Sequence, residues 1–199
     1  MFTGIVGTIG RVEAVDRRPD GLRVRIDAPA IAPELAHGES VSVDGACLTV
    51  EQFDDAGFSV FLASETVDRT VLGDRSPGDQ VNLERAMPAD GRFDGHLVQG
   101  HIDTTTTIID IEEIGEDWNM TFSMPEGYER HIVEKGSIAL DGVSLTIAER
   151  EPDRFTIAII PTTLAETTLS DREIGDEVHV EIDVLAKYVA AMLADHGVN

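Results

Sequence analysis

The chain has 199 residues, of which 38 are Asp or Glu and 15 are Lys or Arg, so its formal net charge is −23. Binding to nucleic acid or to an anionic membrane requires clustered Lys and Arg, and this balance argues against both classes of partner. The acidic residues are spread over the whole chain and form no tail. They indicate a solvated, self-repelling surface, which we interpret as adaptation to high salt.

The cysteine content and the first residues are typical of a cytoplasmic protein. Cys47 is the only cysteine, which excludes an internal disulfide and argues against a thiolate-rich metal site. Residues 1–7 have neither a basic segment nor a long apolar core, and no stretch approaches the length needed to span a bilayer. We therefore expect a cytoplasmic chain whose amino terminus is part of the fold.

Short β-like runs with turn residues between them recur along the first half. The runs lie at 22–26, 40–43, 47–53, 58–62 and 80–85, and the turns lie at 44–45, 54–57 and 76–79. Four of these runs have counterparts in the second half. No long alternation of strands and helices is visible, so we predict an all-β (mainly β) fold with a small antiparallel barrel in each half.

Helices are expected to be few and short. Residues 29–35 predict a weak helical turn with a partner near 125–133, and residues 64–69 and 162–166 resemble helix starts with polar caps. Residues 183–195 place apolar side chains at helical spacing. This last helix either packs against the same helix of other subunits or docks on its own barrel, and the pattern alone leaves both open.

One segment of the chain is present twice. Residues 41–84 align without a gap with residues 138–181 at a constant offset of 97, and the Asp-Gly turn at 44–45 falls on the one at 141–142. A repeat near half the chain length indicates two copies of one domain. We expect domains at 1–96 and 97–183, followed by a C-terminal helix at 184–199, with the function carried by differences between the copies.

An ordered set of motifs resembles riboflavin synthase over essentially the whole chain. The motifs are Met1-Phe2-Thr3-Gly4-Ile5-Val6, the paired Asp44-Gly45-Ala46-Cys47-Leu48-Thr49 and Asp141-Gly142-Val143-Ser144-Leu145-Thr146, Gly95-His96-Leu97-Val98-Gln99-Gly100-His101-Ile102-Asp103, and Ile160-Pro161-Thr162-Thr163-Leu164. Each motif is weak alone, but their order and spacing are specific to that family.

The resemblance implies a transferase without a cofactor that catalyses the last step of riboflavin biosynthesis. Two molecules of 6,7-dimethyl-8-ribityllumazine would exchange a four-carbon unit, giving riboflavin and 5-amino-6-(D-ribitylamino)uracil. It also implies two similar closed six-stranded Greek-key barrels and a homotrimer gathered by the C-terminal helix. Each active site would lie between the barrels of different subunits, and lumazine synthase is a further expected partner.

The resemblance also assigns two sets of substrate-binding residues. The amino-terminal pocket would use Gly4, Ile5, Val6, Cys47, Leu48, Thr49, Phe61, Leu62, Ala63, Ser64, Glu65 and Thr66. The carboxy-terminal pocket would use Gly100, His101, Ile102, Lys135, Ser144, Leu145, Thr146, Ala158, Ile159, Ile160, Pro161, Thr162 and Thr163. Asp183 would lie near the site at the subunit contact, or would cap the last helix.

Cys47, Ser144 and His101 are the candidates for catalysis. Cys47 falls opposite Ser144 in the repeat, and it would contact the substrate unless it is simply a packed free cysteine. At the offset of 97, Gly4 falls opposite His101, so we expect an imidazole in only one pocket, for proton transfer or for a structural hydrogen bond. His96 and His101 lack a third ligand nearby, so we expect no metal.

Two other function classes share features with this reading. A lumazine- or flavin-binding optical protein would keep one pocket and lose the other, whereas both copies here retain their Leu-Thr elements. A flavin reductase-type barrel would need a Gly-rich dinucleotide loop between a strand and a helix, and none is present. The enzyme is therefore the predicted function.

Overall fold

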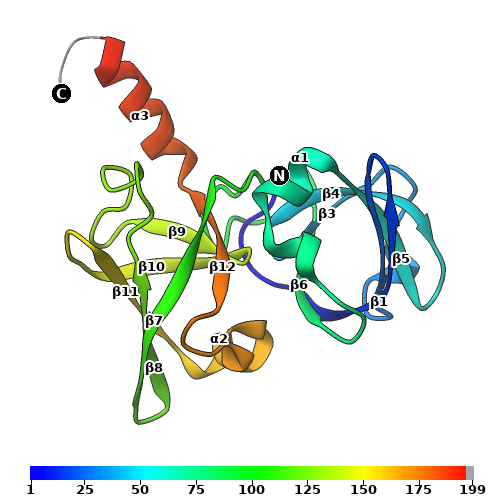
Figure 1. The fold of residues 1–199 in the computed structure, drawn as a ribbon, viewed down its shortest axis with the longest axis horizontal. Coiled ribbons are helices and arrows are strands. Elements are labelled where there is room, and N and C mark those ends of the chain that lie inside the picture. The colour runs from blue at the N-terminus through cyan, green and yellow to red at the C-terminus, as the bar shows by residue number, and fades with distance from the viewer. Residues whose placement is uncertain (196–199) are drawn as a thin grey trace.

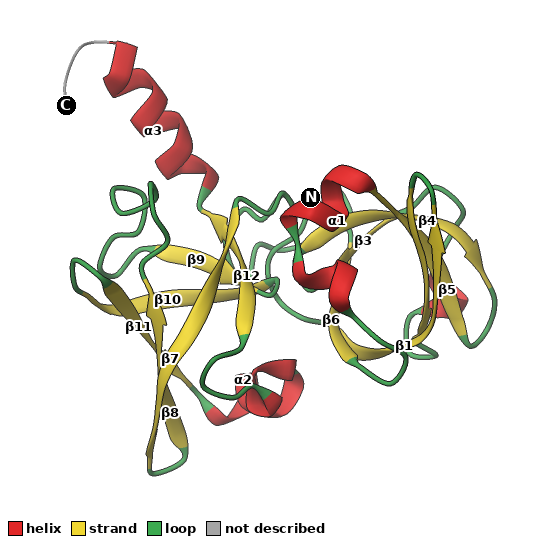
Figure 2. Ribbon diagram, in the orientation of Figure 1, coloured by secondary structure: helices red, strands yellow, loops and turns green. Residues whose placement is uncertain are grey.

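The computed structural model of the protein describes residues 1–195, and residues 196–199 of the predicted last helix lie outside the described part. Two closed barrels lie side by side, and a helix projects from the second barrel (Figure 1). Figure 2 shows that strands make up most of both units, with short helical pieces at their ends. The prediction of two six-stranded antiparallel barrels is confirmed.

The two barrels have the same strand order. The N-barrel is formed by β1 Thr8–Arg18, β2 Gly21–Asp27, β3 Ser40–Val43, β4 Ala46–Phe53, β5 Gly57–Ala63 and β6 Gln80–Arg85. The C-barrel is formed by β7 Thr104–Ile114, β8 Asp117–Ser123, β9 Ser137–Leu140, β10 Val143–Arg150, β11 Arg154–Ile159 and β12 Glu177–Ile182. The N-barrel closes as β1-β2-β5-β4-β3-β6, and the C-barrel repeats this order with the equivalent strands.

Alternation along the strands builds a separate core in each barrel. In β4, Leu48 and Val50 are buried while Thr49 between them is exposed, and β10 repeats the pattern at the equivalent positions. Successive side chains point to opposite faces of a strand, so the apolar set fills the barrel interior. Phe122 and Phe155 stack in the C-barrel with ring centroids 5.3 Å apart.

Helical segments occur at the predicted residues 29–35, 64–69, 162–166 and 183–195, two further short segments were not predicted, and two details of the prediction need correction. The helical segments are η1 Ala32–Glu34, α1 Ser64–Arg69, η2 Val71–Asp74, α2 Pro161–Glu166, η3 Thr168–Asp171 and α3 Val184–Asp195. The predicted partner of η1 near residues 125–133 is wrong as a helix, because that segment contains only turns. The polar caps predicted for α1 and α2 are also wrong, because their N-cap residues are Ala63 and Ile160, without side-chain bonds.

The Asp-Gly turns of the two barrels meet, and each turn is held within its own barrel by an ion pair. Asp44 and Asp141 are fully buried, and each accepts a hydrogen bond from an arginine of its own barrel, Arg75 at 2.8 Å and Arg172 at 2.7 Å. Gly45 and Gly142 face each other, and a Cβ built on either would lie 2.7 Å from the backbone nitrogen of the other. Both glycines have positive φ, so neither position accommodates a side chain.

Two buried side chains cross between the barrels at equivalent positions. Asn82 of β6 donates to the carbonyl of Asp141 at 3.0 Å and accepts the first N–H of η3 at 2.8 Å. His179 of β12 donates through Nδ1 to the carbonyl of Asp44 at 2.7 Å and accepts the first N–H of η2 at Nε2. The contacts are reciprocal, so the barrels are related by a pseudo-twofold axis.

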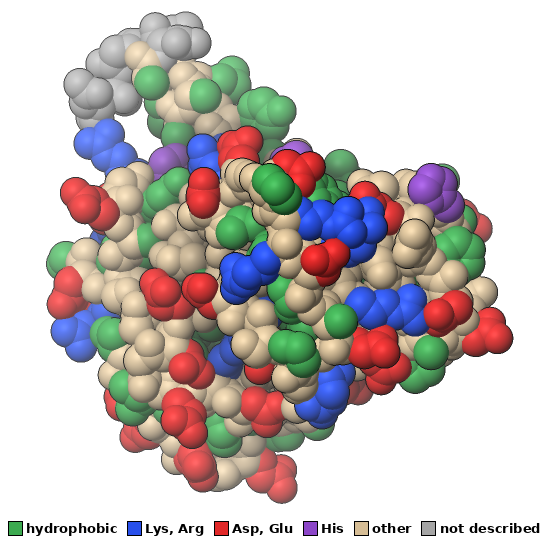
Figure 3. Space-filling view, turned by 45° about the vertical axis from the view of Figure 1, so that its right-hand side comes forward, with side chains coloured by type: hydrophobic (Ala, Val, Ile, Leu, Met, Phe, Trp, Pro, Cys, Tyr) green, Lys and Arg blue, Asp and Glu red, His purple; other side chains and the backbone are tan. Residues whose placement is uncertain are grey.

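The surface differs between the barrels and α3. In Figure 3 acidic side chains are spread over the visible face of the barrels, and Lys and Arg side chains lie among them. On α3, by contrast, large apolar side chains are exposed, including Leu185, Tyr188, Val189, Met192 and Leu193. Within residues 1–195 no helix is long and apolar enough to cross a membrane.

Candidate active site

Two chain segments cross between the barrels and complete the candidate pockets. The carbonyl of Gly100 accepts a hydrogen bond from the N–H of Cys47 at 2.8 Å, and the carbonyl of Gly4 accepts one from the N–H of Ser144 at 2.7 Å. Both glycines have positive φ, and a Cβ on either would lie within 2.7 Å of the side chain that it covers. Each segment therefore lies directly on the start of β4 or β10.

These contacts correct the predicted pairing of the copies. Gly4 occupies the place of Gly100, not that of His101, because both glycines make the same contact with Cys47 or Ser144. His101 therefore corresponds to Ile5. The offset is 96 as far as β2 and β8, and it becomes 97 only at β3 and β9, because the second copy has one more residue in the loop between them.

The crossing also corrects the expected grouping of the pockets. The segment with His101 and Ile102 lies on the N-barrel, and Ile102 packs against the N-barrel core. Conversely, Val6 packs against the core of the C-barrel. The first set of residues in each predicted pocket thus belongs to the pocket of the other barrel.

The N-barrel pocket is a cleft of about 290 Å³ that opens beside the Cys47 thiol. Its size is near the lower end of that of small-molecule sites. Cys47, Thr66 and His101 bring a thiol, a hydroxyl and an imidazole to one space. The other lining residues are Ala46, Ala63, Glu65, Arg69, Thr70, Gly100 and Ile102. Ala46, Arg69 and Thr70 were absent from the predicted set, although Thr70 and its copy Thr167 align in the repeat.

The C-barrel also has an imidazole beside its small polar residue, but it comes from a residue that is not the counterpart of His101 and that was not predicted for the site. His96 Nδ1 is 2.7 Å from Ser144 Oγ, and His96 Nε2 is buried without a hydrogen-bond partner among the described residues. Burial lowers the pKa of His96, while the negative charge of Asp183 opposes this shift. The imidazole is therefore neutral at neutral pH and can accept the hydroxyl proton of Ser144.

Two buried glutamates hold the crossing segments in place. Glu84 on β6 accepts the N–H groups of Thr3 and Gly4 at 2.7 and 2.9 Å. Glu181 on β12 accepts three N–H groups, from residues 99, 100 and 101, at 2.7, 2.8 and 3.0 Å. Burial raises the pKa of both carboxyl groups, and these hydrogen bonds oppose the rise. Neither glutamate was predicted from the sequence.

The remaining predicted residues surround the pockets to different extents. Leu48, Leu62, Leu145 and Ile159 are core residues, and they support the pockets from within the barrels. Thr49, Thr146, Ser64, Ala158, Ile160, Pro161 and Thr162 are exposed, while Phe61, Ile102 and Thr163 are half-buried. Asp183 caps α3, because its Oδ1 accepts the N–H of Leu185 at 2.9 Å.

Lys135 is the predicted site residue that the structure separates from the pockets within this chain. Its Nζ donates to the carbonyl of Ala148 at 2.5 Å, on the part of β10 that lies beyond the Ser144 end. Its φ of 63° is in the left-handed region, where Gly38 stands in the first copy with a φ of 82°. Lys135 is exposed, as expected for a surface charge.

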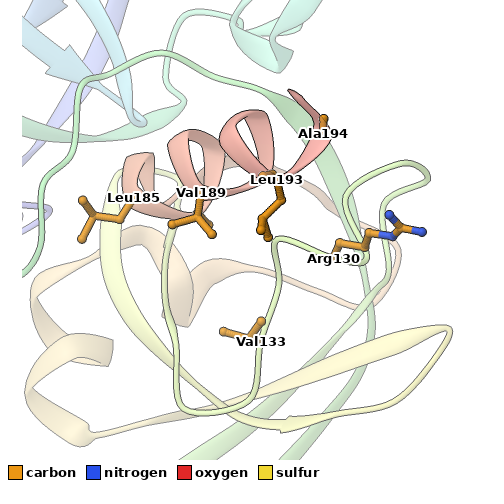
Figure 4. Close-up of a pocket in the computed structure, with 8 residues that line it drawn as sticks. Arg130, Val133, Leu185, Val189, Leu193 and Ala194 are labelled. Atoms are coloured by element: carbon orange, nitrogen blue, oxygen red, sulfur yellow. The ribbon is translucent and has the colours of Figure 1, made fainter. Parts of the chain in front are cut away.

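A larger groove of about 590 Å³ lies between α3 and the C-barrel, away from both pockets. Figure 4 shows Leu185, Val189 and Leu193 on the helix, and Val133 and Arg130 on the loop that faces them. Its lining is almost entirely apolar and includes no thiol, hydroxyl or carboxylate. The groove has the character of a packing surface rather than of a site for chemistry.

Each barrel carries a crossing segment over a small polar side chain, Cys47 or Ser144, and a small-molecule cleft opens at this place in the N-barrel. These features define a duplicated ligand-binding barrel protein. The lumazine binding domain model matches twice, at residues 3–86 and 99–183. A riboflavin synthase of Bacillus subtilis is 41% identical over 97% of this chain and 90% of its own length. One of Schizosaccharomyces pombe is 40% identical over 98% of this chain and 95% of its own length.

Solved structures show the same fold. The structure of LumP complexed with riboflavin has a TM-score of 0.84 and 27% sequence identity, and the match covers 92% of this chain and 99% of that one. LumP complexed with 6,7-dimethyl-8-(1'-D-ribityl) lumazine has a TM-score of 0.83 at 24% identity over the same shares. The chain belongs to the riboflavin synthase family, with two lumazine-binding domains, and it is an enzyme of the transferase type.

Proposed function

We propose that this protein converts two molecules of 6,7-dimethyl-8-ribityllumazine into riboflavin and 5-amino-6-(D-ribitylamino)uracil. One molecule gives up a four-carbon unit and the other receives it, so the atoms balance without an added oxidant or cofactor. The observation that carries this proposal is the pair of equivalent places related by the pseudo-twofold axis, where a crossing segment lies on Cys47 or on Ser144, together with the cleft beside Cys47.

A reaction between two identical molecules gains from two similar pockets on one rigid frame. Holding both reactants removes much of the entropic barrier of their encounter. In a trimer the N-barrel pocket of one subunit would face the C-barrel pocket of another, so each chain contributes to two sites. The LumP structures named above contain riboflavin and the lumazine, which supports this class of ligand for the barrel.

The chemistry begins with loss of a proton from an activated methyl group of the lumazine. In the C-barrel pocket, neutral His96 can take the proton of Ser144 Oγ, and the oxygen can then act as a base or add to the ring. In the N-barrel pocket, the Cys47 thiol and the His101 imidazole line the same cleft. Backbone N–H groups and Thr66 can stabilise the anion.

Incubation of the purified protein with the lumazine alone tests this function. Riboflavin should form together with an equal amount of the ribitylaminouracil, as separated by chromatography. A protein that binds the lumazine tightly but yields no riboflavin above the uncatalysed background would instead be a lumazine- or flavin-binding optical protein. The retention of reactive side chains in both pockets favours the enzyme.

The exposed apolar face of α3 supports self-association of the chain. Its exposed apolar side chains and the adjoining groove have no covering partner within the described part of the chain, and the helix points away from both barrels (Figure 1). We infer that three chains pack through this helix, as the family resemblance implies. Sedimentation should show a trimer for the full chain and a smaller species for a chain ending at Ile182; identical masses would contradict this role.

Three further expectations rest on the sequence alone. Cytoplasmic location and association with lumazine synthase stay predictions. Adaptation to high salt predicts that molar KCl raises the melting temperature, because salt screens the repulsion within a chain of net charge −23. An unchanged melting temperature between low salt and molar KCl would contradict it.

A further inference from the structure

We propose that Glu181 and Glu84 are positioning residues, and that each holds in one barrel the segment that completes the pocket of the other. Glu181 lies on β12 of the C-barrel, yet the residues it binds lie over Cys47 in the N-barrel. Glu84 lies on β6 of the N-barrel, yet the residues it binds lie over Ser144 in the C-barrel. So far as it concerns ligand binding, this role rests on the proposed function.

The contacts of Glu181 leave the segment little freedom. Oε1 accepts the N–H of Gln99, and Oε2 accepts those of Gly100 and His101. Three N–H groups converge on one carboxylate, so three successive residues are oriented by a single side chain. The peptide group between Gly100 and His101 is bound at both ends, since its N–H donates to Glu181 and its carbonyl accepts from Cys47 N–H in the other barrel.

Further bonds tie the same segment to the C-barrel. Asp103 Oδ2 accepts the N–H of Ile182 at 2.8 Å, and Lys187 at the start of α3 pairs with the same oxygen at 2.6 Å. Tyr128 donates from its hydroxyl to the carbonyl of Asp103 at 3.1 Å. The imidazole of His101 is thus placed in the N-barrel pocket largely by side chains of the C-barrel, together with the backbone bond between Cys47 and Gly100.

Glu84 occupies the position equivalent to Glu181 and makes fewer backbone hydrogen bonds, so it provides a matched comparison. Glu84 binds two N–H groups and the hydroxyl of Thr3. The segment is further anchored where Phe2 pairs with Val98 and where the carbonyls of Met1 and Thr3 accept backbone N–H groups. Gly7 stands at the place of Asp103, so no second carboxylate assists. Loss of either glutamate should therefore disturb one pocket, and it should be the pocket of the opposite barrel.

Cys47 provides a direct readout, because it is the only cysteine in the chain and it lies under Gly100 in the N-barrel pocket. The rate at which its thiol reacts with 5,5'-dithiobis(2-nitrobenzoate) depends on how closely the segment at Gly100 covers it, and the control variants below separate this effect from general loosening. Glu181→Gln replaces an accepting oxygen with an NH₂ group that faces backbone N–H donors. We expect this variant to react on the order of tenfold faster than the wild type.

Glu84→Gln is the reciprocal control, and Glu177→Gln is an exposed control on the same strand as Glu181. Both should keep the wild-type rate of Cys47 modification at a temperature well below their melting transitions. A wild-type rate in Glu181→Gln would overturn the role of Glu181. Equal acceleration in Glu181→Gln and Glu84→Gln would also overturn it, because it would indicate general loosening.

Titration with 6,7-dimethyl-8-ribityllumazine gives the second measurement. The wild type should bind two molecules per chain, and each glutamine variant should keep one tight site and weaken the other by on the order of tenfold. Two tight sites in both variants would contradict the positioning role. If the wild type binds no lumazine, the proposed function fails, whereas the Cys47 rates still decide the role of Glu181.

Discussion

The two barrels share the contacts that build their pockets but differ in the groups that the pockets present. Backbone bonds from Gly4 and Gly100, carboxylates at Glu84 and Glu181, and the buried Asp-Arg pairs recur in both copies. Above this common frame, the C-barrel has a hydroxyl bonded to an imidazole, while the N-barrel has a thiol with an imidazole brought by a different residue. A duplicated frame thus keeps its geometry while its side chains take separate roles.

The strongest test of the shared frame removes the buried carboxylates one at a time. Asp44→Ala and Asp141→Ala should each lower the free energy of unfolding by about 3–5 kcal/mol, because a buried arginine and a backbone N–H lose their partner. Urea denaturation measures both values. Similar losses would support equivalence, and Asp153→Ala, in an exposed pair, should change stability by less than about 0.5 kcal/mol.

Kinetics should separate the two pockets. His96→Ala and His101→Ala are each expected to slow turnover by about 10²-fold or more, with smaller effects on lumazine binding, because both imidazoles are placed for proton transfer. Steady-state kcat and an equilibrium titration distinguish rate from affinity. Wild-type turnover in either variant would reduce that histidine to pocket lining.

A double-mutant cycle sharpens this difference. Ser144 and His96 share a hydrogen bond, so the variant with both changed to Ala should be little slower than either single variant. Among the hydrogen bonds of residues 1–195, none joins Cys47 to His101. Substitutions at Cys47 and His101 should therefore slow turnover more independently of each other. Additive effects in the Ser144 and His96 pair would show that the bond has no part in catalysis.

Asn82 and His179 occupy equivalent positions, and replacing one residue type by the other should lower stability only slightly. His179→Asn should cost about 1 kcal/mol, because Asn82 already makes the equivalent donor and acceptor bonds in the other barrel. His179→Ala should cost about 2–3 kcal/mol, since it leaves a buried carbonyl and an N–H unpaired. Equal losses of stability in both variants would show that this contact between the barrels requires the imidazole ring itself.

The smallest effect concerns pH. Burial depresses the pKa of His96 below its ordinary value of 6.5, so the unfolded chain binds a proton that the folded chain does not. Stability should therefore fall as pH decreases below about 6.5, by at most about 1.4 kcal/mol per pH unit for one proton. The raised pKa values of Glu84 and Glu181 act in the opposite direction at lower pH.

The difference between wild type and His96→Gln isolates this contribution. Denaturation midpoints between pH 5.5 and 7.5 should decline more steeply toward acid in the wild type than in the variant. Parallel curves would show that His96 titrates alike in the folded and unfolded chain.

Much of the fold followed from local patterns, because β4 alternates between buried and exposed residues, β3, β5 and β6 are short buried runs, and these strands end at clear turns. Residues 40–43 and 80–85 were predicted with the bounds that the structure has. Strand β1 was missed because its second half, Ala14–Arg18, pairs only with β2 and has no buried face, so it carries no alternation. Its copy β7 is alike in this respect.

The crossing of the pockets could not be predicted from the repeat. Gly4 and Ser144 meet through a contact between distant parts of the chain, and the constant offset concealed the one-residue step before β3. His96 gave no pattern of its own, because it lies outside the aligned segment and was considered only as a metal ligand. An alignment of the first segments at 96 would have paired the two glycines.

The facing Gly45 and Gly142 also constrain how such a chain can evolve. Most positions of a duplicated gene are free to diverge, because a change in one copy leaves the other untouched. Here a side chain gained by either copy would collide with the backbone of its sibling. Gly45 and Gly142 are therefore constrained together, and a side chain at either position disturbs both copies even when the other copy is unchanged.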